Sequence, residues 1–431
     1  MKPIKVVDSI MGSGKTSAII QMINNSREEK YIFVTPFLDE VDRIEKECSS
    51  KQFYSPHNYT KDKKSARKMD SLIELLSEGK NIATTHALFE ETQTELIELI
   101  REHNYTLILD ETMNVLETIT LTKPDQDLLF DNNIIFKDNK GFIHWNLDNP
   151  KAEEYYGKFS DIKKKSLNKN LVAYDDKTVL WTFPHETFKA FKECYILTYI
   201  FDGQLQKYYF DLHGIPYEKY TVRPVDGFGG RYYKIVRGDN REEDFKKRTE
   251  LKDKIKIYEG KYNDIGEGKF ALCMSWYKKK HPKGKDVKKL ASNMDGFFEY
   301  LNKAKAKERF WTTFKDFKDK FEQRYNGQLL ACNIRATNDY KDCTYVAYTI
   351  NRFMNPLISN YFAQRSCTVN QDLWAVSELV QFIFRSAIRE GEEIHLYIPS
   401  KRMRSLLEDW LDGKDIESTY EVPANLPEDT E

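Results

Sequence analysis

Residues 9–16, Ser-Ile-Met-Gly-Ser-Gly-Lys-Thr, constrain the fold more than any other stretch of this chain. They follow a short β-branched run at residues 4–7 and precede residues 17–23, whose apolar positions recur at helical spacing. A strand, a glycine-rich turn and a helix in this order build a phosphate-binding loop, because main-chain N–H groups and the positive end of the helix surround the phosphate oxygens. Ser9 stands where the first glycine of this pattern usually occurs. The stretch therefore predicts a nucleotide site.

The loop also offers groups for a nucleotide and its metal ion. Lys15 can reach the β- and γ-phosphates, and the hydroxyl of Thr16 can bind Mg²⁺. ATP and Mg²⁺ are therefore the expected cofactors. A chance Gly-Lys-Thr turn is the alternative, and the flanking strand and helix disfavour it. The candidate nucleotide-binding residues of the loop are Met11, Gly12, Ser13, Gly14, Lys15, Thr16 and Ser17.

Short apolar strands alternate with helical segments through the first half of the chain. Strands are expected at residues 31–34, 82–86, 105–109, 179–182 and 194–201, and helices at 38–47, 69–76 and 88–102. This alternation predicts an α/β fold with a parallel, doubly wound sheet. Such sheets bind ligands at the carboxyl ends of their strands, where Thr16, Thr35, Thr84 and Asp110 are expected.

The second half repeats this alternation and predicts a second α/β lobe. Its strands are expected at residues 254–258, 270–276, 310–313, 329–332, 345–350 and 394–398. Residues 118–177 do not follow the alternation of strands and helices, and we interpret them as an insertion in the first lobe with a hairpin at 132–145. Three glycines within residues 225–230 suggest a hinge, which gives a first lobe over 1–225 and a second over 226–412. The acidic residues 413–431 are expected to be a disordered tail.

Composition narrows the class of protein. A formal net charge of −1 over 431 residues means that nucleic acid must be bound by a local groove rather than by overall charge. Six scattered cysteines without a Cys-x-x-Cys pair argue against zinc and against a disulfide framework. The first strand begins too early for a signal peptide, and the apolar runs are far shorter than a membrane span. We expect a cytoplasmic protein without membrane contact.

Asp110 and Glu111 follow a compact apolar strand and could complete an ATP-hydrolysing site. Asp110 would hold Mg²⁺ together with Thr16, and Glu111 would orient the attacking water and accept its proton. An exposed acidic pair at a turn is the alternative. The pairing with the phosphate-binding loop favours the catalytic interpretation.

These two motifs resemble motifs I and II of the DEAD-like superfamily 2 helicases, through Gly-Ser-Gly-Lys-Thr at 12–16 and Asp-Glu-Thr-Met at 110–113. Further likenesses follow in the family's order: residues 34–36 to motif Ia, 83–86 to motif Ic, 197–199 to motif III and 311–314 to motif IV. Residues 335–338, Arg-Ala-Thr-Asn, are similar to motif V, with Ala and Asn in place of Gly and Asp. The resemblance spans about residues 4–400 and implies two RecA-like lobes. The chain is also similar to replication helicases encoded by phages of Gram-positive bacteria.

Residues 381–389 resemble motif VI of the same family, with the last arginine one residue late. Gln381, Arg385 and Arg389 are spaced i, i+4 and i+8, so they are expected on one face of a helix. The resemblance implies that Gln381 and Arg389 contact the nucleotide and that Arg385 is an arginine finger, which stabilises charge on the transferring phosphoryl group. Solvated helix arginines are the alternative.

Nucleic-acid contacts are expected from small side chains at strand ends, which suit backbone phosphates without reading sequence. Strand-end threonines also cap helices, so this alternative stays open. Aromatic side chains at 276, 277 and 311 could stack on bases, although packing in a core is favoured; packing is also favoured for His86. The candidate contacts are Thr35, Pro36, Thr84, Thr85, Thr312, Thr313 and Arg335.

The function that the sequence favours is an ATP-driven nucleic-acid helicase or translocase. Single-stranded DNA is the favoured track, RNA stays open, replication proteins are further candidate partners, and a monomer is favoured over an oligomer. The alternative is an ATPase switch that grips nucleic acid or a partner without unwinding. A plain P-loop kinase is disfavoured, because it leaves the likenesses to motifs V and VI unexplained.

Overall fold

The computed structural model describes residues 2–58, 68–92, 94–175, 178–227, 230–239, 241–280, 285–321, 323–332 and 339–417. The chain forms two compact units. The first comprises Met1–Val7, Lys15–Arg237 and Asn355–Val369, and the second comprises Asp8–Gly14, Gly238–Met354 and Asn370–Glu431. Within the described ranges, no helix is long and apolar enough to cross a membrane.

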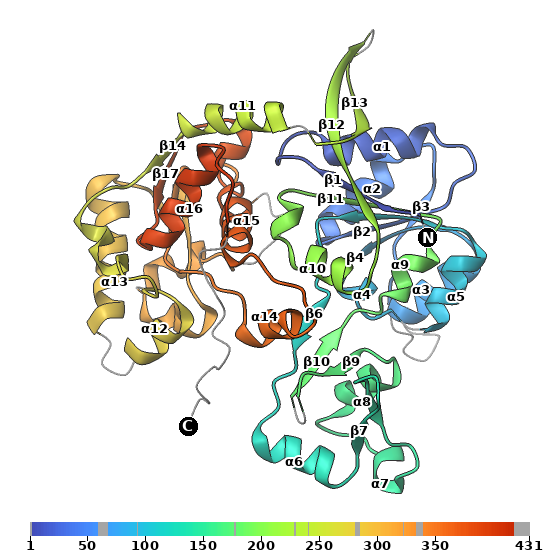
Figure 1. Ribbon diagram of the computed structural model, residues 1–431. Coiled ribbons are helices and arrows are strands. Elements are labelled where there is room, and N and C mark those ends of the chain that lie inside the picture. The colour runs from blue at the N-terminus through green and yellow to red at the C-terminus, as the bar shows by residue number, and fades with distance from the viewer. Residues whose placement is uncertain are drawn as a thin grey trace. The chain divides into compact units, whose positions relative to one another are not determined.

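An eight-stranded sheet forms the core of the first unit (Figure 1). Its spatial order is β13 (Gly230–Arg237), β12 (Tyr217–Gly227), β1 (Ile4–Asp8), β11 (Glu193–Thr198), β5 (Thr106–Asp110), β2 (Tyr31–Thr35), β4 (Asn81–Thr85) and β3 (Phe53–Tyr54). β12 is parallel to β1, β5 to both β11 and β2, and β4 to both β2 and β3. All five residues of β2 and of β5 are buried, as expected for parallel strands covered on both faces.

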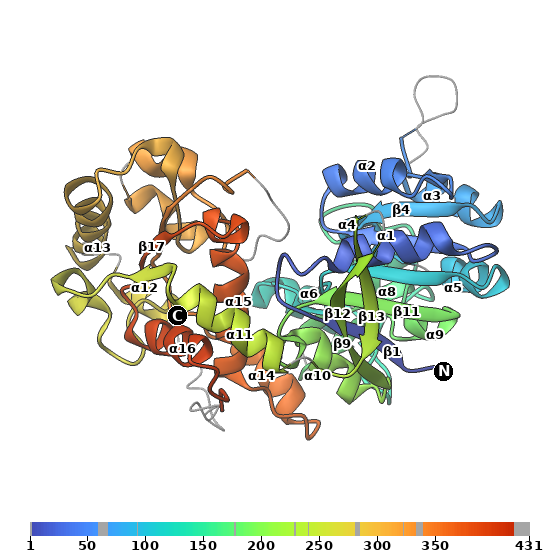
Figure 2. The same ribbon diagram turned by 90° about the horizontal axis from the view of Figure 1, so that it is seen from above.

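Helices cover both faces of this sheet. α1 (Lys15–Asn25) and α2 (Leu38–Glu47) pack on one face, against a cluster that includes Tyr31, Phe33 and Ile108. Figures 1 and 2 also show α3 (Lys68–Ser77), α4 (His86–Phe89), α5 (Thr94–Glu102), α9 (Glu186–Ala190) and α10 (Leu205–Leu212) of this unit. The short helix η1 (Phe201–Gly203) precedes α10. The single helix expected at 88–102 is wrong, because the chain leaves helical geometry after Phe89, where the Thr92 hydroxyl donates to the Phe89 carbonyl.

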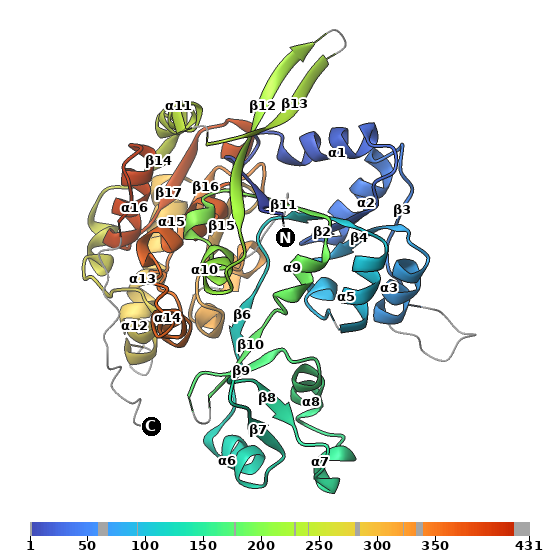
Figure 3. The same ribbon diagram turned by 45° about the vertical axis from the view of Figure 1, so that its right-hand side comes forward.

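The expected insertion forms a small subdomain of the first unit (Figure 3). Its elements are β6 (Leu116–Thr118), α6 (Lys123–Asp131), β7 (Ile135–Lys137), β8 (Ile143–Trp145), α7 (Pro150–Glu153), α8 (Ser160–Leu167), β9 (Leu171–Ala173) and β10 (Val179–Thr182). The expected hairpin is confirmed as β7–β8, whose turn is held by Asp138 carboxylate bonds to the N–H groups of Lys140 and Phe142. The expectation that 179–182 rejoins the main sheet is wrong, because β10 pairs antiparallel with β6 and β9.

Residues 225–227 and 230, within the range that we expected as a hinge, belong instead to the antiparallel hairpin β12–β13 (Figure 3). Gly227 pairs with Gly230, so two of the three glycines lie at the ends of these strands. Residues 228 and 229 lie outside the described ranges. Composition alone does not separate a glycine-rich linker from a glycine-rich hairpin end, since both use the same conformational freedom.

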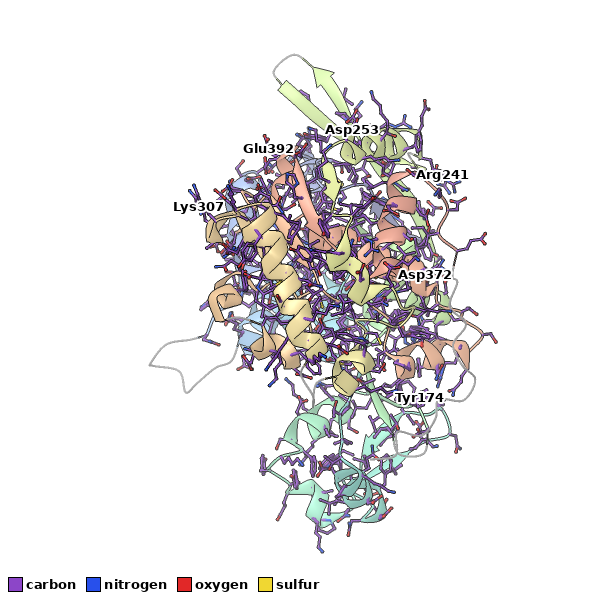
Figure 4. All side chains as sticks on the ribbon, turned by 90° about the vertical axis from the view of Figure 1, so that its left-hand side faces the viewer. Tyr174, Arg241, Asp253, Lys307, Asp372 and Glu392 are labelled. Carbon is purple, nitrogen blue, oxygen red and sulfur yellow. The ribbon has the colours of Figure 1, made fainter. Side chains whose placement is uncertain are left out.

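A parallel four-stranded sheet forms the core of the second unit, in the order β14 (Ile255–Ile257), β17 (Ile394–Tyr397), β16 (Tyr345–Tyr348) and β15 (Arg309–Thr312). Its longer helices are α11 (Arg241–Lys252), α12 (Met274–Lys280), α13 (Lys285–Asp295), α15 (Gln371–Ile383) and α16 (Lys401–Leu411). Its short helices are η2 (Lys261–Gly266), η3 (Gly296–Leu301), η4 (Ala306–Glu308), η5 (Lys315–Lys320), η6 (Gln323–Gln328) and η7 (Ala387–Glu390). Asp372, labelled in Figure 4, lies in the first turn of α15, where its buried carboxylate accepts from the Arg402 Nε at 2.8 Å.

Two expected strands of the second unit are wrong. Residues 270–276 form a turn that leads into α12; Leu272 has a φ of 62°, and the side-chain amide of Asn351 donates to the carbonyls of Lys269 and Ala271. Residues 329–332 contribute only a bridge between Leu329 and Trp311 within the described ranges. Four other expected strands are confirmed as β14, β15, β16 and β17.

One helix of the second half of the chain belongs to the first unit. α14 (Pro356–Ala363) lies in the segment Asn355–Val369 and packs on the first unit, where the rings of Phe362 and Tyr208 are 6.2 Å apart. The Cys367 thiol donates to the Tyr208 carbonyl at 3.6 Å. The expected disordered tail falls largely on residues 418–431, which lie outside the described ranges.

Candidate functional site

The glycine-rich loop joins β1 to α1, as the sequence predicts. Gly12 and Gly14 have φ values of 75° and 87°, a left-handed conformation that costs glycine little and strains other residues. Left-handed residues within such a turn let consecutive N–H groups form an anion-binding nest. The Ser13 hydroxyl is buried and has no hydrogen-bond partner among the described residues. The loop thus has the backbone geometry and a spare donor for a phosphate.

The residues that follow the loop begin α1. Lys15 is the first residue of the helix and only 9% exposed. Thr16 and Ser17 are half-buried in the first turn, and Met11 is half-buried before it. A helix N-terminus carries positive partial charge, which adds to that of the Lys15 ammonium. Charge and N–H donors therefore gather at this end of the helix.

Asp110 ends the central strand β5 and is 9% exposed. Burial, the largest cause, and the negative charges of Glu111 and Glu40 together raise the pKa of its carboxyl to about 7, although Lys15 and Arg43 lower it. The influence of Lys15 shows that the structure brings the loop lysine and the strand-end carboxylate together within the first unit. A buried carboxylate of raised pKa is a group that an added cation would stabilise.

Glu111 has a strained backbone and an unpartnered side-chain oxygen. Its φ is 64°, a left-handed conformation that costs a non-glycine residue about 1–3 kcal/mol. Its N–H donates to the Leu197 carbonyl at 2.8 Å, which ties it to the end of β11. Its Oε2 is buried without a hydrogen-bond partner in the described part of the chain. The fold therefore holds a carboxylate oxygen ready for a proton donor that none of the described residues supplies.

Four side chains hold residues 110–114 in place. Sequence reasoning missed or misjudged each of them. The Gln204 side-chain oxygen accepts from the Thr112 hydroxyl at 3.2 Å, and that of Gln206 accepts from the Met113 N–H at 3.1 Å. Glu90 accepts from the Asn114 N–H at 3.2 Å, and the His86 Nε2 lies 2.9 Å from the Asp110 carbonyl oxygen. His86 was expected to pack, and its half-buried ring makes this bond as well. For Gln204, Gln206 and Glu90, the only sequence signal was the presence of two glutamines at the start of a helix.

The predicted nucleic-acid residues of the first unit lie side by side at the ends of β2 and β4, where Thr35 pairs with Thr85. Thr35 is fully buried and Thr84 is 2% exposed, whereas Pro36 and Thr85 are half-buried. In the second unit Thr312 is fully buried, and the buried Thr313 hydroxyl donates to the Tyr277 hydroxyl at 3.2 Å. Arg335, with the rest of residues 333–338, lies outside the described ranges.

The predicted shared helix face of Gln381, Arg385 and Arg389 is wrong. α15 ends at Ile383, because the Ser386 hydroxyl donates to the Ile383 carbonyl. The same hydroxyl accepts from the Ile388 N–H at the start of η7. Gln381 and Arg385 are 5% and 6% exposed, and Arg389 is exposed. All three belong to the second unit.

The favoured interpretation of two aromatic side chains as core residues is confirmed. Trp311 is fully buried and its indole N–H donates to the Tyr325 carbonyl at 2.7 Å. Tyr277 is fully buried and its hydroxyl donates to the Thr349 carbonyl at 2.8 Å. Trp276 is half-buried. Trp311 and Tyr277 are therefore not positioned to stack on bases.

Asp110→Asn is expected to stabilise the ligand-free protein. Because folding raises the pKa of Asp110 from 3.8 to about 7, the unfolded chain loses this proton first, and stability falls as pH rises through that window. Above pH 7 the penalty is on the order of 4 kcal/mol, and asparagine avoids it. Urea denaturation at pH 8 should therefore show a higher free energy of unfolding for the variant, and near pH 4 the gain should vanish.

Asp125→Asn is the matched control, since the Lys158 ammonium lowers the pKa of this half-buried carboxyl. Removing its charge should slightly reduce stability at pH 8, which is the opposite sign. Equal unfolding free energies for Asp110→Asn and wild type at pH 8 would show that Asp110 carries no burial penalty.

Family models match two segments of this chain. The "YonV C-terminal Rossmann-like domain" matches residues 249–411, and the "YonV middle domain" matches residues 116–181, which run from β6 into β10. The SPbeta prophage-derived uncharacterized protein YonV of Bacillus subtilis (strain 168) is 43% identical over 418 residues, which cover 96% of this chain and 100% of the relative.

Solved helicase structures are similar at low identity. An XPD helicase is 12% identical with a TM-score of 0.45, and covers 95% of this chain and 94% of its own. Xpd4 of S. tokodaii is 10% identical with a TM-score of 0.46, and covers 96% of this chain and 94% of its own. The DUF1998 helicase MrfA bound to DNA is 10% identical with a TM-score of 0.32, and covers 97% of this chain and 50% of its own.

Proposed function

The chain belongs to the YonV family, and we propose that it is an ATP-dependent nucleic-acid helicase or translocase whose nucleotide site lies at the carboxyl end of the first unit's sheet. The observation that carries the proposal is the pair at the end of β5. There a buried Asp110 of raised pKa, near Lys15, is followed by the strained Glu111 with a buried, unpartnered oxygen. Acid and base carboxylates in different environments are typical of sites that move protons.

The residues present fit ATP with Mg²⁺. Asp110 and Thr16 would hold the ion, and Mg²⁺ typically takes one or two protein oxygens and fills its other positions with phosphate and water. When bound, Mg²⁺ neutralises charge on the β- and γ-phosphates.

The protein's own groups would divide the remaining work. The loop N–H groups and Lys15 would bind and orient the phosphates, and Glu111 would hold a water and accept its proton at Oε2. Gln204 and Gln206 would keep Glu111 in place through their bonds to Thr112 and Met113. The motif VI likeness supports Arg385 of the second unit as the arginine finger, with Gln381 and Arg389 on the nucleotide.

The nucleic-acid part of the proposal rests on the resemblance to superfamily 2 helicases and on the strand-end residues Thr35, Pro36, Thr84 and Thr85. Half-buried Pro36 and Thr85 offer surface there, and the main-chain N–H groups of such turns suit phosphates. Single-stranded DNA is the favoured track. The relative is described as prophage-derived, which agrees with a role in phage replication or recombination.

The test is ATP hydrolysis by the full chain at low salt, alone and with poly(dT) or poly(U). We expect one polymer to raise the rate severalfold, with an effect that weakens steeply as salt increases, because phosphate contacts release counterions. Arg385→Ala should remove the stimulated rate. Rates that ignore both polymers would contradict the nucleic-acid proposal. Stimulation without displacement of a paired strand would instead favour a translocase or the ATPase switch, for which the inserted subdomain offers a partner surface.

A further inference from the structure

A pocket in the first unit, away from Lys15 and Asp110, has a chemistry that the proposed function does not use. Its volume is about 230 Å³, and it lies between α4 with the residues after it and α8 of the inserted subdomain. Clefts for drug-sized ligands usually measure about 300–1,000 Å³. This pocket is therefore suited to a group the size of one side chain rather than to a nucleotide.

The pocket lining includes one buried aromatic residue and one buried amide residue with an unsatisfied acceptor. Trp181 of β10 and Asn170 both line it, at 5% and 2% exposure. The Asn170 Oδ1 is buried and has no hydrogen-bond partner among the described residues. A buried amide oxygen without a donor costs about 1–3 kcal/mol, so this position favours a ligand that donates.

The charged lining is predominantly acidic. It consists of Glu90, Glu91, Glu117, Asp161, Lys164 and Lys165. Each lysine is already paired with a carboxylate of the lining: Lys164 with Glu91 at 2.5 Å and Lys165 with Asp161 at 2.7 Å. Four carboxylates against two ammonium groups leave a negative balance, which disfavours an anion and favours a cation.

We propose that this pocket binds a guanidinium group. A guanidinium is planar, carries five N–H donors and stacks on aromatic rings, so one group could donate to Asn170 and to a carboxylate while lying against Trp181. The group could come from a free small guanidinium compound or from an arginine side chain of a protein partner. Glu90, which lines the pocket, also accepts from the Asn114 N–H, three residues after Glu111.

Calorimetric titration of the full chain with butylguanidinium and with acetyl-Gly-Arg-Gly-amide tests the proposal. We expect saturable binding of butylguanidinium at a single site and no binding of butyl phosphate. Binding of the peptide as well would identify an arginine side chain as the ligand. Binding of butylguanidinium alone would identify a free small cation. Absence of binding by both guanidinium probes would overturn the proposal.

Two variants of opposite expected sign separate this site from a general loss of structure. Glu117→Gln should weaken binding about tenfold, equivalent to about 1.4 kcal/mol, because it removes a carboxylate of nearly the same shape. Lys164→Gln should strengthen binding, because it releases the Glu91 carboxylate. Glu154→Gln, in the same subdomain but outside the pocket lining, should change nothing. The reverse signs for Glu117 and Lys164 would show an anion site and would also overturn the proposal. These readouts need no ATP hydrolysis, so they are independent of the proposed function.

Discussion

Lys15→Ala is expected to lower kcat/KM for ATP hydrolysis by about a thousandfold or more, since in the proposed function the Lys15 ammonium would act on the phosphates from a largely buried position. Lys15 is 9% exposed at the first turn of α1, so water cannot readily replace it. The same change should raise the pKa of Asp110, because Lys15 is one of the two cations that lower it. Steady-state hydrolysis and fluorescent-nucleotide binding measure the first effect.

Lys46→Ala is the control for this variant, because Lys46 is exposed in the last turn of α2 on the same unit. It should hydrolyse ATP as wild type does. Full activity of Lys15→Ala would mean that the glycine loop does not serve a phosphate, and the nucleotide site would then have to be sought elsewhere.

Glu111→Gln is expected to slow hydrolysis by about 10²–10⁴-fold while nucleotide binding is retained. Glutamine keeps the shape and the strained backbone but cannot accept a proton, so only the chemical step should suffer. The measurement is kcat together with the dissociation constant of a nonhydrolysable analogue. Unchanged kcat would exclude Glu111 as the base.

Glu98→Gln, on the exposed surface of α5, is the matched control and should leave kcat unchanged. An equal loss of nucleotide binding in Glu111→Gln would point to a disturbed loop rather than to a missing base. The Gln204 and Gln206 oxygens accept hydrogen bonds from the two residues after Glu111 in either variant, which is why we expect the two effects to separate.

The parts of this fold that sequence predicted are those dominated by local pattern. β2, β5 and α2 follow from uninterrupted apolar runs and from helical periodicity, and the glycine loop follows from its fixed spacing. The mixed α/β class with two mainly parallel sheets is likewise confirmed. These sequence patterns can be recognised without knowing which residues pack against the element.

The parts that sequence missed depend on distant partners. The sequence of β10 predicts a buried strand, but it does not indicate whether this strand pairs with the main sheet or, as observed, with β6 and β9. The helical spacing alone would continue α15 through Arg385. The helix ends earlier because the Ser386 hydroxyl makes hydrogen bonds with main-chain groups. Gln204 and Gln206 matter because a loop about 90 residues earlier needs acceptors, which no window of sequence reveals.

Because α14 belongs to the first unit although it lies in the second half of the chain, the gene cannot be divided at a single point into its two units. The segment Asn355–Val369 completes the first unit, yet the chain on either side of it belongs to the second. A fragment ending at Arg237 would lack the helix that covers Tyr208 and contacts β6, and a fragment beginning at Gly238 would carry that helix with its apolar face exposed. Neither half is a self-sufficient module, so recombination that shuffles intact domains should find no clean breakpoint between them. Inheritance of the whole chain as one block is the expected evolutionary pattern.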